Sequence, residues 1–155
     1  MRNAVKVSKL KDGPSLSYLI KWMERKVRLE LEAALAPLEV SVPEYTALSV
    51  LQEDRELSSA QLARRTFVSA QAMHPIVVEL DRRGLAARRN DPRDGRIQLV
   101  CLTERGKKQL AACHQASALA EARAFAGLSR TETETLRKTL DRCARNIANN
   151  HEQRP

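Results

Sequence analysis

The stretch "RRNDPRDGRIQLVCLTERG", residues 88–106, decides the fold expected of this chain. Its centre, "DPRDGR", places Pro and Gly among four charged side chains, a composition typical of an exposed tight turn. The runs that flank it, "LAARR" and "IQLVCL", have the length and composition of short strands. Thr103 follows the second run and suits the N-cap of a helix. The stretch therefore predicts a β-hairpin with a charged tip, followed directly by a helix.

Helix starts elsewhere are marked by capping boxes, in which a Ser accepts from an amide three residues on while Glu or Gln reaches back. The boxes are Ser41-Val-Pro-Glu44, Ser58-Ser-Ala-Gln61 and Ser129-Arg-Thr-Glu132. Ser69 provides a further start, and Gly84 suits the end of the helix that begins there. Together with apolar periodicity, these signals predict helices over residues 16–36, 43–53, 59–65, 70–83, 104–126 and 130–149.

The segment "SSAQLARRTFVSAQAMHPIVVELDRRG" predicts two helices joined by a three-residue turn. Met73, Ile76, Val77 and Leu80 follow the i, i+3, i+4, i+7 rule and form the expected buried face of the second helix. This pattern is that of a helix-turn-helix, although other pairs of packed helices imitate it. The hairpin that follows would be a wing. The expected fold class is mainly α with a small β-hairpin wing, a winged helix-turn-helix with terminal dimerisation helices.

Charge points to a polyanionic partner. The chain carries a net charge of +8 and has an isoelectric point near 9.9. Residues 55–108 contain twelve Lys or Arg against six Asp or Glu, so most of the excess falls in the central segment. Nucleic acid is the favoured partner, ahead of an anionic membrane surface, and a soluble protein that happens to be basic is the alternative. With the expected helix-turn-helix and wing, the predicted partner is double-stranded DNA.

The second helix of the pair carries the predicted base-reading side chains. Gln71 and His74 lie near its N-terminal end, which recognition helices present to the bases, and both can bond to base edges. Arg88 and Arg89 are candidates for phosphate contact, and Asp94 is expected to pair with Arg93 or Arg96. The alternative is an ordinary solvated face. The predicted DNA-contacting residues are Ser69, Gln71, His74, Pro75, Arg82, Arg88, Arg89, Arg93, Asp94 and Arg96.

We expect residues 1–155 to form one domain, with the DNA-binding module at 41–103 and dimerisation helices at 15–36 and 104–149. The terminal helices carry apolar stripes that a small central module cannot cover. Pairing with a second copy is favoured, and packing on the domain's own core is the alternative.

The run Asp91-Pro-Arg93-Asp94-Gly-Arg96 followed by Leu102-Thr103-Glu-Arg-Gly106 resembles the wing signature of the MarR family of bacterial transcriptional regulators. The resemblance covers nearly the whole chain in element order. It implies a winged-helix homodimer that binds a palindromic operator and, in many members, releases DNA when a small phenolic anion binds. By position, Arg96 matches the arginine that members insert into the minor groove, and Asp94 the acid that orients it.

A ligand pocket is expected beside the first helix. Trp22 and Tyr45 would line it, and Arg25 would hold a carboxylate with two parallel hydrogen bonds. The expected ligand is a small aromatic acid. Plain core or interface packing of the two aromatic rings is an equal alternative.

Other classes of protein fit less well. The sequence has no Gly-rich phosphate loop, nucleophile elbow or paired His and carboxylate at useful spacing, so we expect no enzyme. Cys101, Cys113 and Cys143 are odd in number and scattered, which indicates a reducing cytoplasm and predicts no metal site or cofactor. No secretory signal or membrane contact is expected. A ligand-independent architectural or RNA-binding winged helix remains the main alternative.

Overall fold

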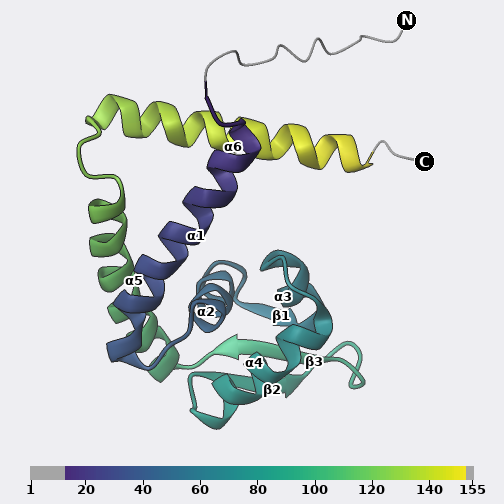
Figure 1. The fold of residues 1–155 in the computed structure, drawn as a ribbon. Coiled ribbons are helices and arrows are strands. Elements are labelled where there is room, and N and C mark those ends of the chain that lie inside the picture. The colour runs from purple at the N-terminus through teal and green to yellow at the C-terminus, as the bar shows by residue number, and fades with distance from the viewer. Residues whose placement is uncertain (1–12, 153–155) are drawn as a thin grey trace, which may run out of the picture.

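The computed structural model describes residues 13–152 and confirms the mainly α winged helix-turn-helix (Figure 1). Its helices and strands are α1 (Leu16–Leu35), the 3-10 helix η1 (Ala36–Leu38), α2 (Val42–Asp54), β1 (Glu56–Ser58), α3 (Ser59–Arg65), α4 (Ala70–Arg82), β2 (Ala86–Asn90), β3 (Gln98–Leu102), α5 (Glu104–Ala124) and α6 (Arg130–Glu152). The long helices α1, α5 and α6 lie outside a compact module formed by the elements from α2 to β3.

The predicted helix starts are confirmed. Ser41 with Glu44 and Ser58 with Gln61 make both reciprocal bonds of the capping box. Ser129 and Glu132 do the same at the start of α6. Because each box satisfies amides that the first helical turn leaves without partners, these starts are fixed by local chemistry.

The predicted hairpin is part of a larger sheet. Strands β2 and β3 pair antiparallel, with Arg88 opposite Val100, and β1 adds to the other edge of β3 in the order β1-β3-β2. Strand β1 was not predicted, because three residues are too few to show an alternating pattern. It connects the end of α2 to the capping box that begins α3.

The core of the module lies where α2, α3, α4 and the sheet meet. Met73, Val77 and Leu80 of α4 are buried as predicted, and Ile76 is half-buried. Ala63 of α3 is also buried, and its small side chain permits α3 and α4 to approach closely. This packing presents the opposite face of α4 to solvent.

The outer helices leave much apolar surface uncovered. Helices α1 and α5 pack against each other, but large apolar side chains remain exposed along α1, α5 and α6. They include Leu16, Ile20, Trp22, Leu119, Leu140 and Ile147. Exposed apolar surface on this scale is typical of protein–protein interfaces.

Candidate nucleic-acid interface and ligand cavities

The exposed face of α4 carries the predicted base-reading side chains. Gln71, His74, Pro75 and Arg82 are all exposed, while Ser69 caps the helix by accepting from the Ala72 amide at 3.1 Å. The N-terminal end of α4 points to the same side of the module as the loop between β2 and β3 (Figure 1). The exposed face of α4 and a charged loop thus face the same way.

Pro75 is the sixth residue of α4, which continues through it to Arg82. Because proline has no N–H, the carbonyl of Gln71 lacks its usual partner within the helix. Gln71 is an exposed residue in the first turn of α4.

Two aspartates fix the backbone of the loop between β2 and β3. Asp91 accepts a hydrogen bond from the Arg93 amide at 2.8 Å, and Asp94 accepts one from the Arg96 amide at 3.0 Å. Within residues 13–147 Asp94 makes no ion pair with Arg93 or Arg96, so the expected side-chain pairing is not made in this structure, and the carboxylate holds the turn. Short Asp side chains favour this bond because they reach an amide two residues ahead.

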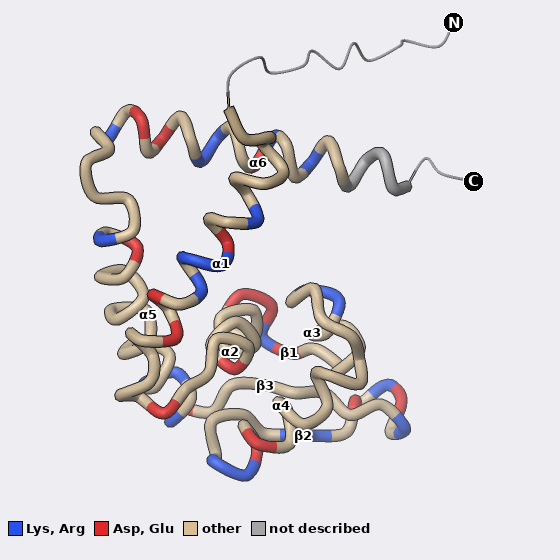
Figure 2. Tube along the Cα trace, viewed as in Figure 1, with Lys and Arg blue, Asp and Glu red and all other residues tan. Residues whose placement is uncertain are grey.

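The candidate arginines fall into two groups. Arg82 donates to Glu79, Arg88 donates to Asp81 at 2.8 Å, and Arg89 donates to Glu56. Within residues 13–147, by contrast, neither Arg93 nor Arg96 makes an ion pair (Figure 2 shows the charged residues). The guanidinium groups at the tip of the hairpin can therefore bind an anion without first breaking an ion pair to a carboxylate.

The acids that hold the paired arginines were missed by sequence reasoning. Glu56 lies on β1, which was not predicted, and its hydrogen bond raises the pKa of Arg89. The hydrogen bond from Arg82 lowers the pKa of Glu79, although both groups are exposed. Only the Glu79–Arg82 pair has the i, i+3 spacing that a sequence can show.

Trp22, Arg25 and Tyr45, which were predicted to line a ligand pocket, do not lie together around a cavity beside α1. The hydroxyl of Tyr45 lies 3.0 Å from Nδ1 of His114, whose Nε2 lies 3.1 Å from the Gln52 side chain. Trp22 is 51% exposed and Arg25 is exposed. None of the three predicted residues lines either cavity beside α1.

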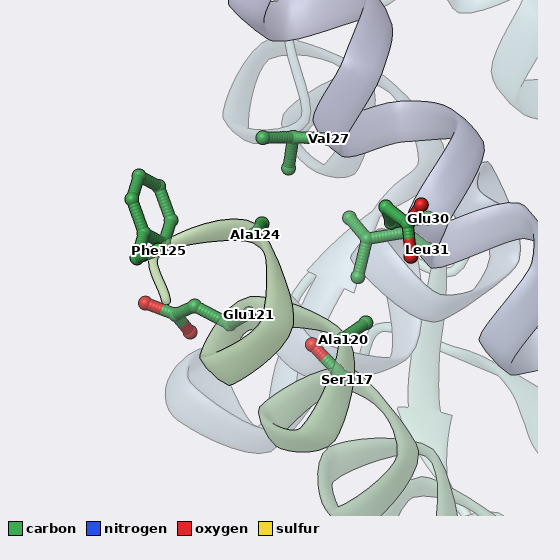
Figure 3. A pocket seen from close by; sticks show the side chains of 8 residues that line it. All are labelled: Val27, Glu30, Leu31, Ser117, Ala120, Glu121, Ala124 and Phe125. Carbon is green, nitrogen blue, oxygen red and sulfur yellow. The ribbon is translucent and has the colours of Figure 1, made fainter. Parts of the chain in front are cut away.

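One of these cavities, about 180 Å³ in volume, lies between α1 and α5 (Figure 3). Its walls are mostly apolar, but Glu30 and Glu121 also line it. Two carboxylates and no Lys or Arg make this cavity unsuitable for an anionic ligand.

The other cavity, about 120 Å³ in volume, lies between α1 and the helix-turn-helix. Its lining residues are Arg28, Val42, Pro43, Thr46, Thr66, Val68, Met73 and Ile76. Arg28 hydrogen-bonds Glu24 through Nε at 2.8 Å, and this bond raises its pKa. Both threonine hydroxyls donate to backbone carbonyls at 2.8 Å, Thr46 to Val42 and Thr66 to Leu62. Arg28 is therefore the side chain of this lining that can donate to a carboxylate, and it lies beside apolar walls, a combination that suits a small aromatic acid. Met73 and Ile76 belong to α4, so an occupant would touch the helix that carries the predicted base-reading side chains.

Cys113 is fully buried, and burial raises the pKa of its thiol, which favours the unreactive protonated form. Among residues 13–152, no three or more His, Cys, Asp or Glu side chains are grouped so that they could hold a metal ion. None of the helices in that range combines the length and hydropathy that a bilayer crossing requires.

Comparison with known proteins places this geometry in a family. Residues 38–97 match the model of the MarR family. The chain is 32% identical over 133 residues to the HTH-type transcriptional repressor Rv2887 of Mycobacterium tuberculosis, covering 86% of this chain and 96% of the relative. The chain belongs to the MarR family. Its relatives are transcriptional regulators, and none of the activities named for them is enzymatic.

Two solved structures of Rv2887 resemble this MarR-family chain. The complex with DNA has a TM-score of 0.73 at 31% identity and covers 85% of this chain and 98% of that one. The complex with salicylic acid has a TM-score of 0.72 at 32% identity and covers 86% and 99%. The resemblance extends beyond the winged helix to most of the outer helices.

Proposed function

We propose that this chain is a homodimeric transcriptional repressor that binds a palindromic operator and leaves it when a small aromatic acid binds. Arg93 and Arg96 carry the proposal: they lie in the loop between β2 and β3 and make no ion pair within residues 13–147, and this loop lies on the same side of the module as the N-terminal end of α4. The helix would enter the major groove, and the hairpin would lie as a wing along the adjacent minor groove. The DNA complex of Rv2887 supports this assignment.

The exposed apolar side chains of α1, α5 and α6 separate a dimerisation region from the DNA-binding module. Residues 41–103 would contact DNA, while 15–36 and 104–149 would join two copies. A palindrome mirrors the two-fold symmetry of a dimer, so two copies of α4 would read two half-sites about one helical turn apart.

Selection of binding sites from random duplex DNA tests the function. The expected product is a short palindrome, whose affinity exceeds that of unrelated duplex by a factor on the order of 10³ or more. Binding to all duplexes with a common salt dependence would instead identify an architectural protein, and preference for RNA would identify the other alternative.

The first prediction concerns the oligomeric state. Sedimentation equilibrium at micromolar concentration should give twice the chain mass of 17.4 kDa. Leu140→Glu and Ile147→Glu together should shift the equilibrium toward monomer, because both side chains are exposed apolar residues of α6. Ala60→Glu, an exposed position of α3 in the module assigned to DNA contact, serves as the comparison and should leave the mass unchanged. A stable wild-type monomer would exclude the proposed dimer.

The second prediction assigns the acid-binding group. We expect salicylate to bind in the cavity between α1 and the helix-turn-helix, with Arg28 as the partner of its carboxylate. The Arg28 guanidinium would then be shared between Glu24 and the ligand. Arg28→Ala should weaken salicylate binding by about ten- to a hundredfold, the usual range for a lost charged hydrogen bond. Arg25→Ala is the matched control, because Arg25 lies on the same helix and lines neither cavity beside it.

Trp22, the only tryptophan, provides the measurement by fluorescence, with DNA release followed in parallel. Both responses should saturate over one concentration range. If Arg25→Ala weakened binding and Arg28→Ala did not, the sequence-based assignment of the anchor would replace this one.

A further inference from the structure

Helices α3 and α4 end in the same backbone motif. At the end of α4, the Gly84 amide donates to the Asp81 carbonyl and the Leu85 amide to the Leu80 carbonyl, both at 2.9 Å. Gly84 has a φ of 66°. These two bonds define the Schellman motif, whose left-handed residue is usually glycine.

At the end of α3, Phe67 stands where α4 has glycine. Its amide donates to the Arg64 carbonyl at 3.3 Å, and the following Val68 amide donates to the Ala63 carbonyl at 3.1 Å. Phe67 has a φ of 58°. The left-handed conformation brings its Cβ close to the following carbonyl oxygen, so glycine would be more favourable at this position.

Burial does not compensate for this strain. Phe67 is 96% exposed, more than any other large apolar side chain described between residues 13 and 147. Glu39 and Arg55, the other non-glycine residues there with positive φ, are polar and suit an exposed site. In the free protein Phe67 therefore carries backbone strain that burial of its ring does not offset.

The ring is placed beside the DNA-reading elements. Phe67 lies in the turn between α3 and α4, two residues before Ser69, which caps α4. In helix-turn-helix proteins the first helix crosses the DNA backbone and the second enters the major groove at its N-terminal end. The turn therefore lies at the rim of the face that meets DNA.

We propose that Phe67 is a specificity-determining residue that contacts the C5-methyl group of a thymine at the edge of each half-site. An aromatic ring without donors or acceptors suits this methyl group, which is the apolar group that bases present in the major groove. Contact would bury a side chain that is otherwise exposed, which offsets the backbone strain. The inference rests on the proposed operator binding.

Phe67→Gly separates this role from a structural one. Removing the Cβ relieves strain, so the melting temperature should rise by about 2–4 °C at fixed protein concentration. Affinity for the operator selected by the wild-type chain should nevertheless fall about tenfold, while affinity for unrelated duplex stays unchanged. Glu39→Gly is the matched control: it relieves the same kind of strain at the end of η1 and should leave operator affinity unchanged.

Replacing single thymines of the operator by deoxyuridine, which lacks the methyl group, locates the contact. One position in each half-site should weaken wild-type binding and leave Phe67→Gly binding unaffected. The inference is wrong if Phe67→Gly binds the operator as tightly as wild type, if its melting temperature falls, or if no thymine couples to residue 67. If the wild-type chain selects no operator, the proposed function fails before this inference is tested.

Discussion

Replacing Gly106 with alanine should destabilise the fold by about 3 kcal/mol or more, which corresponds to a fall in melting temperature of roughly 6–12 °C. Gly106 lies in the first turn of α5, where the chain leaves the sheet. A Cβ at this position would lie 1.9 Å from the carbonyl oxygen of Leu85 and 2.9 Å from its carbonyl carbon. The clash is with backbone atoms, so no change of side-chain rotamer relieves it.

The Leu85 carbonyl is not free to move away. The Thr103 amide donates to it at 3.2 Å, and the Thr103 hydroxyl donates to the neighbouring Gly84 carbonyl at 2.6 Å. The same hydroxyl accepts from the Gly106 amide at 2.9 Å, which begins α5. One threonine thus joins the end of α4 to the start of α5, and a larger residue at 106 would separate them.

Gly95→Ala is the matched control for this substitution. Gly95 lies at the tip of the hairpin, and an added Cβ there would meet no atom within 4 Å. We expect its free energy of unfolding to stay within about 0.5 kcal/mol of wild type. Thermal unfolding at one protein concentration compares the variants, and equal stability of Gly106→Ala and wild type would contradict the close approach.

Sequence reasoning located the helices because their starts depend on neighbouring residues. The Ser in each capping box bonds an amide three positions away, so the bond is visible in the sequence itself. Gly84 marked the end of α4 for the same reason, since its left-handed conformation is a local preference. The Schellman motif at Phe67 was not predicted, because the left-handed position holds phenylalanine and not the usual glycine.

Contacts between segments far apart in the sequence could not be predicted, because they depend on the tertiary fold. Glu56 and Arg89 are 33 positions apart, and they meet only because β1 and β2 flank β3. Tyr45 and His114 are 69 positions apart and meet across α2 and α5. The cavity between α1 and the helix-turn-helix depends on how α1 crosses the module, so periodicity identified the helix but not Arg28 as its cavity-lining arginine.

Arg96, which makes no ion pair within residues 13–147, should contribute more to operator binding than Arg89, which is paired with Glu56. Arg96→Ala should weaken operator binding by about 1–3 kcal/mol, the range for a lost specific contact. The Asp94 carboxylate binds the Arg96 backbone, which fixes the loop and leaves the guanidinium available to the minor groove. The narrow minor groove of A-tracts has a strongly negative potential. A guanidinium that the loop already holds in position therefore gains the most binding free energy there.

Arg89→Ala provides the comparison. To contact a phosphate, Arg89 would have to leave Glu56, so the net gain from such a contact is smaller than for an arginine without a carboxylate partner. We expect a smaller loss for this variant, shared by operator and unrelated duplex, with the salt slope lowered by about one. Arg96→Ala should instead reduce the ratio of operator to unrelated affinity, because its contact depends on groove width. Titrations of both duplexes at several salt concentrations measure these quantities, and unchanged operator affinity of Arg96→Ala at physiological salt would exclude the wing from DNA recognition.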